Sequence, residues 1–228
     1  MSGKSALIVA GGKGLRMKQS TPKQFTILAG KPVVVRTIET FLRFDPNISI
    51  ILVLSEDLFP DWEKIREAHL PHEKIVVAQG GNTRFQSVNS GLNLVKEELV
   101  AIHDAVRPLV SIHSIGQSFE AAATTGSGIV AVRLKDSIRR KNSDGTTHTE
   151  DRSLFYTVQT PQTFQTSLIK KAFQLKEQEN FTDDASVYET AGMKVTLVEG
   201  DYTNLKITTP EDLWIAEAIL KSGSYRES

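Results

Sequence analysis

The sequence contains no cysteine, which excludes disulfide frameworks, thiolate metal sites and cysteine nucleophiles. Nothing therefore marks an oxidising compartment, and we expect a cytoplasmic protein. An excess of charge of either sign is also missing, because 27 Lys and Arg residues balance 27 Asp and Glu residues. Without a basic excess to attract a phosphate backbone, no nucleic-acid partner is expected.

Long apolar runs are missing as well. The first apolar stretch, residues 5–10, ends at a pair of glycines and is too short for the core of a signal peptide. No later run approaches the ~18 apolar residues of a membrane span, so no membrane partner is expected. The 228 residues are 39% hydrophobic and 24% charged, which is typical of a compact globular chain. We expect one α/β domain over residues 1–228 with an inserted arm.

Short apolar segments rich in β-branched residues alternate with segments of helical period. Buried strands are expected at 6–10, 48–54, 75–78, 99–103, 129–132 and 195–198. Helices are expected around 85–95, where Phe85, Val88, Leu92 and Val95 share one face, around 168–175, and from Pro210 onward with Thr209 as N-cap. This alternation predicts a three-layer α/β/α sandwich around a mostly parallel, Rossmann-like sheet.

One polar segment interrupts the alternation. Residues 133–156 have no apolar stripe, and Ser143-Asp144-Gly145 is a hairpin turn signal. We expect a protruding β-arm, inserted at about 133–157, that returns to the domain at Tyr156-Thr157-Val158. Arg139-Arg140-Lys141 is interpreted as a solvated part of this hairpin.

The loop after the first strand has the composition of a phosphate site. Ligands of open α/β sheets bind beyond the carboxyl ends of the strands, and Gly11, Gly12 and Gly14 stand there with Arg16 and Lys23. Glycine amides can approach an anion closely, and the two cations add positive charge. The loop lacks the third glycine of a dinucleotide fingerprint and the Gly-Lys-Ser/Thr of a P-loop. A tight turn with solvated charges is the plain alternative.

Two more polar clusters, residues 80–84 and 103–108, follow the third and fourth expected strands. Asp104 suits a metal ion or sugar hydroxyls, although a salt bridge to Arg107 beside a half-buried His103 is the simpler interpretation. For residues 182–186 the simpler interpretation is that they cap a helix. For Lys206, in a short expected strand, it is a surface lysine.

Together these residues carry a family resemblance. The motifs are Gly-Gly-x-Gly-x-Arg-Met at 11–17, Pro-Lys-Gln-Phe at 22–25, His-Asp-Ala-Val-Arg-Pro at 103–108, Thr-Pro-Gln at 160–162, Thr-Asp-Asp-Ala-Ser at 182–186, and Asn-Leu-Lys-Ile-Thr followed by Thr-Pro-Glu-Asp-Leu at 204–213. From Ala6 to about Leu220 the chain closely resembles the methylerythritol phosphate cytidylyltransferases of the non-mevalonate isoprenoid pathway. The resemblance implies a nucleotide-diphospho-sugar transferase fold and an enzyme that joins CTP to methylerythritol phosphate, releasing pyrophosphate.

The resemblance also implies a site. Its catalytic residues would be Arg16, Lys23, Arg152 and Lys206. CTP would be bound by Ala10, Gly11, Gly12, Gly14, Arg16, Lys23, Gly81, Asn82, Ser87 and Asp104. The polyol phosphate would be bound by Asp104, Arg107, Ser137, Arg152, Thr182 and Lys206. Asn82 stands where the family often has Asp, and Ser137 replaces a usual Thr while keeping the hydroxyl.

The same resemblance implies Mg²⁺ as the counter-ion of the triphosphate, with no side chain assigned as its ligand. It further implies a homodimer interlocked through the arm, with Arg107, Ser137 and Arg152 reaching the neighbouring subunit's site. Two alternatives remain open at this point. A ribitol-5-phosphate cytidylyltransferase would share fold and loop, and a catalytically silent nucleotide-binding subunit would be expected to lack Arg16, Lys23 or Lys206, all of which are present.

Overall fold

The computed structural model describes residues 3–10 and 22–222. Its centre is a seven-stranded sheet in the order β11-β7-β10-β6-β1-β4-β5. The strands are β1 (Lys4–Val9), β4 (Ser49–Leu54), β5 (Ile75–Gln79), β6 (Leu99–Asp104), β7 (Ser127–Arg133), β10 (Tyr156–Gln165) and β11 (Leu197–Glu199). β10 runs antiparallel to its neighbours β6 and β7, and every other neighbouring pair in this sheet is parallel.

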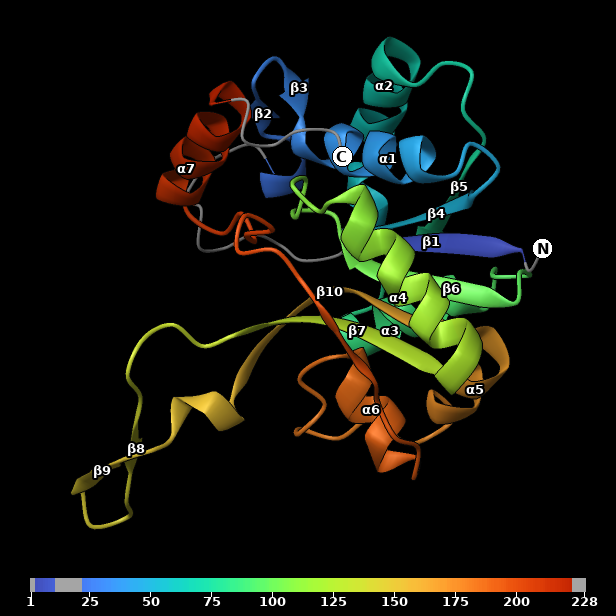
Figure 1. Ribbon diagram of the computed structural model, residues 1–228. Coiled ribbons are helices and arrows are strands. Elements are labelled where there is room, and N and C mark those ends of the chain that lie inside the picture. Colours follow the sequence, from blue (N-terminus) through green and yellow to red (C-terminus); the bar gives the residue numbers. More distant parts are fainter. Residues whose placement is uncertain (1–2, 11–21, 223–228) are drawn as a thin grey trace.

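Helices cover both faces of the sheet, as Figure 1 shows. On one face, α1 (Val33–Phe44), α2 (Phe59–His69) and α4 (Ile112–Thr125) share an apolar cluster with alternate residues of β1, β4 and β6. On the other, α3 (Arg84–Leu92), α5 (Thr166–Ala172) and α6 (Asp184–Thr190) pack against the remaining ones. Because both faces are buried, the central strands are almost continuously apolar. The expected three-layer sandwich with a mostly parallel sheet is confirmed.

Strand ends differ from the expected ones by a few residues at most. The expected helices end earlier, at Leu92 and Ala172, although Val95 remains buried in the same cluster as α3. No strand surrounds Lys206 in the described part of the chain, so that expectation was wrong. The start of α7 (Pro210–Lys221) is as expected, since the Thr209 side chain caps it by accepting the backbone N–H of Asp212.

A third apolar cluster determines where the segment before α7 lies. It joins α7 and β2 (Ile27–Leu28), which pairs with β3 (Lys31–Pro32), to the loop that follows β6. Ile207 is fully buried there, and its backbone N–H donates to the carbonyl of Val106 over 2.9 Å. This contact fixes the neighbouring Lys206 close to the end of β6.

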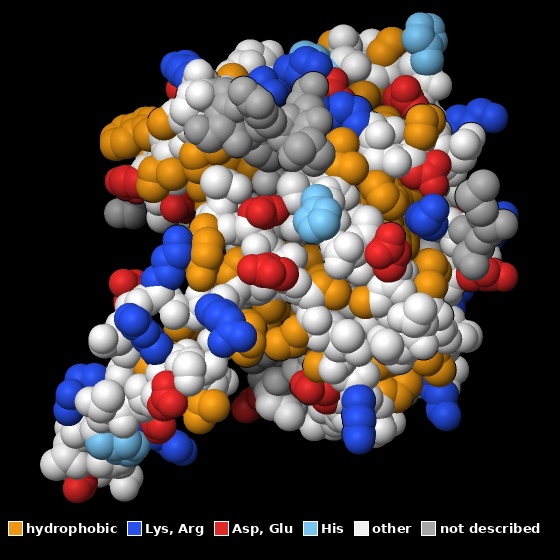
Figure 2. Space-filling view, viewed as in Figure 1, with side chains coloured by type: hydrophobic (Ala, Val, Ile, Leu, Met, Phe, Trp, Pro, Cys, Tyr) orange, Lys and Arg blue, Asp and Glu red, His pale blue; other side chains and the backbone are white. Residues whose placement is uncertain are grey.

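The polar segment forms the expected arm, which extends away from the sheet in Figure 1. Its tip is a hairpin of β8 (Arg139–Lys141) and β9 (Thr147–Thr149), and the short 3-10 helix η4 (Arg152–Leu154) leads back to β10. Gly145 adopts a φ of 86° in the turn, a conformation that favours glycine. Arg139, Arg140 and Lys141 are exposed, and Figure 2 shows basic side chains along this arm.

Candidate active site

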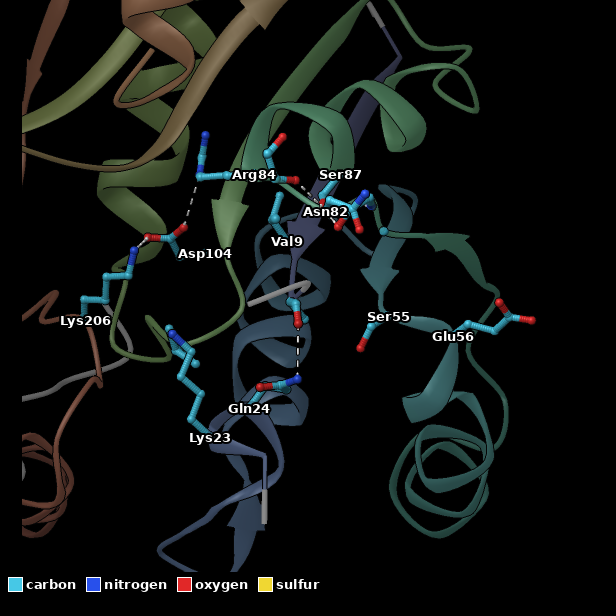
Figure 3. Close-up of a pocket in the computed structure, with 15 residues that line it drawn as sticks. Val9, Lys23, Gln24, Ser55, Glu56, Asn82, Arg84, Ser87, Asp104 and Lys206 are labelled. Atoms are coloured by element: carbon cyan, nitrogen blue, oxygen red, sulfur yellow. Dashed lines mark hydrogen bonds and ion pairs between the residues drawn. The ribbon is translucent and has the colours of Figure 1, made fainter. Parts of the chain in front are cut away.

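A cavity of about 530 Å³ opens at the edge of the sheet where four parallel strands end. β1, β4, β5 and β6 deliver Ala10, Ser55, the 80–84 loop and Asp104 to this edge, which is where open α/β sheets bind ligands. The lining residues are Val9, Ala10, Lys23, Gln24, Ser55, Glu56, Gly80, Gly81, Asn82, Thr83, Arg84, Ser87, Asp104, Val106 and Lys206 (Figure 3). Of the three clusters expected to converge, residues 80–84 and Asp104 do so, whereas the glycine loop at 11–14 lies outside the described residues.

Asp104, the last residue of β6, is the electrostatic centre of the cavity. Lys206 Nζ lies 2.9 Å and Arg107 Nε 3.4 Å from its Oδ2, and Arg84 Nε lies 4.0 Å from its Oδ1. Burial by itself would raise the pKa of the Asp104 carboxyl, but the charges of Lys206, Arg84 and Arg107 outweigh burial and hold that pKa well below its usual range. Asp104 is therefore ionised at neutral pH, and the simple pair with Arg107 is part of a larger cluster.

Arg84 belongs to the polar cluster at 80–84, but the sequence assigned it no role in the site. It begins α3, and its guanidinium makes two hydrogen bonds to the fully buried carboxylate of Asp184, at 2.7 and 2.6 Å. This bidentate contact ties α3 to α6 and leaves Arg84 beside Asp104 (Figure 3). Asp184 stands next to Asp183, which caps α6 as expected for this segment.

The loop that follows β5 is held by side chains of α3. Ser87, buried on α3, accepts the backbone N–H of Gly81 over 3.1 Å and donates to the carbonyl of Thr83 over 2.8 Å. The side-chain oxygen of Gln86 accepts the backbone N–H of Asn82. The Asn82 side chain is exposed at the cavity, so this loop presents a fixed backbone and one amide group to a ligand.

The opposite part of the cavity contains the segment after Pro22. Lys23 begins the 3-10 helix η2 (Lys23–Phe25), and Figure 3 shows its side chain reaching toward the part of the cavity that holds Asp104 and Lys206. Gln24 is buried, and its amide donates to the carbonyl of Ala10 over 3.1 Å. The segment with Lys23 is thereby tied to the end of β1.

The remaining site residues inferred from sequence lie elsewhere. Arg107 sits behind Asp104, where its guanidinium also donates to the backbone carbonyl of Asn204 over 2.7 Å. Ser137 and Arg152 are exposed on the arm, and Thr182 is exposed before α6; none of the three lines this cavity. Gly11, Gly12, Gly14 and Arg16 lie outside the described residues.

Within residues 3–10 and 22–222, no three His, Asp or Glu side chains form a group that could hold a metal ion. Among these residues, too, no helix is long and apolar enough to cross a membrane.

Comparison with known proteins agrees with this geometry. A family model described as 2-C-methyl-D-erythritol 4-phosphate cytidylyltransferase matches residues 5–222. The enzyme of that name from Bacteroides fragilis is 45% identical over 218 residues, which cover 95% of this chain and 99% of the relative. The one from Geobacillus kaustophilus is 41% identical over 95% of this chain and 96% of its own.

Solved structures show the same relationship. The 4-diphosphocytidyl-2C-methyl-D-erythritol synthase of Anaerococcus prevotii superposes with a TM-score of 0.84 at 32% identity, covering 96% of this chain and 99% of its own. The 2-C-methyl-D-erythritol 4-phosphate cytidylyltransferase of Thermus thermophilus gives 0.76 at 29% identity, over 97% and 100% of the two chains. The family match spans both the strand ends that form the cavity and the arm, and the chain belongs to the 2-C-methyl-D-erythritol 4-phosphate cytidylyltransferase family.

Proposed function

We propose that this chain transfers the cytidylyl group of CTP to 2-C-methyl-D-erythritol 4-phosphate in isoprenoid precursor biosynthesis. The observation that carries this proposal is the cavity at the ends of the parallel strands, in which Arg84 and Lys206 pair with the ionised Asp104 and Lys23 lines the same space. Such a cavity offers cations to two phosphate-bearing substrates and a carboxylate to a hydroxyl group. The family to which the chain belongs supplies the identity of both substrates.

The chemistry needs positioning more than a reactive side chain. An oxygen of the substrate phosphate attacks the α-phosphorus of CTP, a new P–O bond forms, and the bond to the β-phosphate oxygen breaks to release pyrophosphate. Negative charge builds up on the α-phosphoryl oxygens and on the leaving group. Fixed cations lower the barrier by meeting that charge, and no covalent enzyme intermediate is required.

We assign the cations by their places in the cavity. Lys23 and Arg16 would stabilise the charge that develops on the triphosphate, with the amides of Gly11, Gly12 and Gly14 holding its oxygens. Lys206 would orient the attacking phosphate, and Asp104 would accept a hydrogen bond from a hydroxyl of either substrate. The two lysines that line the cavity with Asp104 support this division.

The loop after β5 is assigned to the base. Gly81 and Asn82 line the cavity, and the Ser87 hydroxyl stabilises the loop by accepting the backbone N–H of Gly81. Cytosine carries an exocyclic amine where uracil carries a carbonyl. Backbone carbonyls or the Asn82 amide oxygen would therefore accept a hydrogen bond from cytosine but not from uracil.

We propose Mg²⁺ as the counter-ion of the triphosphate. Magnesium in nucleotide sites is commonly held by one or two carboxylates together with substrate phosphates. Asp104 and Glu56 are the acidic side chains that line the cavity, and the ionised Asp104 fits this donor set. The ion would neutralise phosphate charge. Turnover that persists in excess chelator would refute the requirement.

We also propose a homodimer joined through the arm. Leu154, Phe155, Tyr156 and Val158 at the base of the arm are exposed, with Leu154 at 76%, and a second chain would remove this apolar surface from water. Ser137 and Arg152, which do not line the cavity of their own chain, would then contribute to the neighbouring subunit's site, whereas Arg107 pairs with Asp104 of its own chain. Sedimentation equilibrium should give twice the chain mass; a monomer would contradict this proposal.

The substrates are water-soluble phosphates, and we propose that the reaction takes place in the cytoplasm. Activity should fractionate with the cytosolic marker enzymes of the source cell.

Turnover measurements test the proposed function directly. Purified protein is incubated with CTP, Mg²⁺ and either methylerythritol phosphate or ribitol 5-phosphate, and pyrophosphate release is followed. We expect kcat/KM to be at least 100-fold higher with methylerythritol phosphate. Preference for ribitol phosphate, or no turnover with either substrate, would refute the assignment.

A further inference from the structure

His103 is the β6 residue directly before Asp104, and its side chain is fully buried behind the cavity. Its ring meets the Phe41 ring edge-on, with 5.0 Å between centroids. Both ring nitrogens have polar neighbours at 3.1 Å: Nε2 faces the backbone carbonyl of Arg107, and Nδ1 faces the hydroxyl of Thr160 on β10. This arrangement differs from the half-buried histidine expected from the sequence.

The partners determine where the hydrogens lie. A carbonyl can only accept, so Nε2 must carry a proton and donate it to Arg107 O. The Thr160 hydroxyl oxygen accepts the backbone N–H of Asp104, also 3.1 Å away, so its hydrogen is left to donate to Nδ1. Nδ1 is therefore an unprotonated acceptor. The donor and the acceptor of each of these three hydrogen bonds are thus defined.

We propose that His103, through Thr160, is a positioning residue that fixes the Asp104–Arg107 turn and thereby the orientation of the Asp104 carboxylate in the cavity. The chain of hydrogen bonds runs from Asp104 N–H to Thr160, on to His103, and from there to Arg107 O, so it clamps both ends of the turn. The two clamped residues are the ones whose side chains pair across the same turn, at 3.4 Å.

A second set of contacts explains why loss of the Thr160 hydrogen bonds should lower the reaction rate. Asn204, fully buried two residues before Lys206, donates from its amide to the carbonyl of Thr160 over 2.9 Å and accepts from Arg107 at its own carbonyl. Thr160 thus contacts the segments that carry both Asp104 and Lys206. A shift of this strand would alter the 2.9 Å pair between those two side chains, and misplacement of catalytic groups by about 1 Å can cost 100-fold in rate.

The inference rests on the proposed function for its kinetic part. Its structural part does not, and is tested by nitrogen NMR of the uniformly ¹⁵N-labelled protein at pH 7.5. The ring signals of His103 are identified by their loss in His103→Gln. We expect Nε2 to be protonated and Nδ1 to be an unprotonated acceptor. A proton on Nδ1, or an imidazolium, would overturn the proposal whether or not the protein turns over CTP.

The kinetic part uses Thr160→Val, which keeps the shape and removes the hydroxyl. The matched control is Thr163→Val, since Thr163 is also buried on β10 and also bonds through its hydroxyl, to Ser118 at 2.8 Å, but away from the cavity. We expect kcat to fall at least 10-fold in Thr160→Val, with a smaller change in the KM for CTP, and to recover in Thr160→Ser. Thr163→Val should lower the melting temperature with kcat unchanged. Equal kcat in the two valine variants, or no recovery with serine, would overturn the proposal; an inactive wild type would instead refute the proposed function.

Discussion

Buried neutral histidine makes the folded state sensitive to acid, and this sensitivity can be calculated for His103. The pKa of the side chain falls from its ordinary value of 6.5 to about 4, first because the ring is buried. The nearby charges act in both directions: Asp104 favours the imidazolium, and Arg107 and Lys206 oppose it. Below pH 6.5 His103 becomes protonated in the unfolded chain but stays neutral in the folded one. The free energy of unfolding therefore decreases as the pH falls, until about pH 4.

The perturbation that isolates this effect is His103→Gln, which has no titrating group and keeps an amide that can donate to Arg107 O. At 1.36 kcal/mol for each unit of pKa, the wild type should lose ~2.5 kcal/mol more than the variant between pH 7.5 and 4.5. Other titrating groups are common to both proteins and largely cancel in the comparison.

The assay is urea unfolding of both proteins at pH 7.5 and 4.5, at one protein concentration because the stability of the proposed dimer would depend on concentration. The variant's stability relative to wild type should be ~2.5 kcal/mol more favourable at pH 4.5 than at pH 7.5. A difference that does not change with pH would show that His103 is not held neutral by burial, and would refute the reasoning.

Four further predictions concern the site, the arm and the core. Lys23→Ala should lower kcat ~100- to 1000-fold with a smaller change in the KM for CTP, because a cation that meets developing charge acts chiefly on the rate; near-normal kcat with a raised KM would move Lys23 to ground-state binding. CTP should be preferred to UTP by kcat/KM, and comparable values would contradict a cytosine-reading loop after β5. Arg152→Ala and Lys206→Ala proteins, each inactive alone, should recover about a quarter of wild-type activity after subunit exchange, because half the dimers are mixed and each mixed dimer has one intact site; no recovery after verified exchange would reject a site shared between subunits. Gly128→Ala should lower the melting temperature markedly, since its Cβ would stand 2.2 Å from the backbone oxygen of Ser118, with overpacking costing ~1–3 kcal/mol or more, and an unchanged melting curve would show that α4 and β7 can separate freely.

The features that follow from local sequence were predictable. Apolar runs bounded by glycine and polar residues marked the parallel strands, because both faces of such strands are buried. The turn at Ser143-Asp144-Gly145 marked the arm, and Thr209 before Pro210 marked the start of α7. Each of these signals lies within a few residues of the element that it specifies. Residues that are close together in the sequence are therefore enough to predict that element.

The resemblance of the motifs to a family determined the expected activity, but the electrostatics of the cavity depend on contacts between distant segments. Asp104 and Arg107 are three residues apart and could be paired by inspection. Lys206 reaches the same carboxylate because the adjacent Ile207 is buried against the loop after β6. Arg84 does so because Asp184 holds its guanidinium.

Local sequence predicted the six parallel strands of the sheet, the arm and the helix caps, and the motifs indicated the family. The strand β10 was not expected; its antiparallel place between β6 and β7, with Thr160 between His103 and the Asp104 backbone, is seen in the folded molecule alone. Burial and pairing of polar groups depend on which strands become neighbours. No periodicity along the chain records that choice, so the tautomer of a histidine and the charge on an aspartate are properties of the folded molecule.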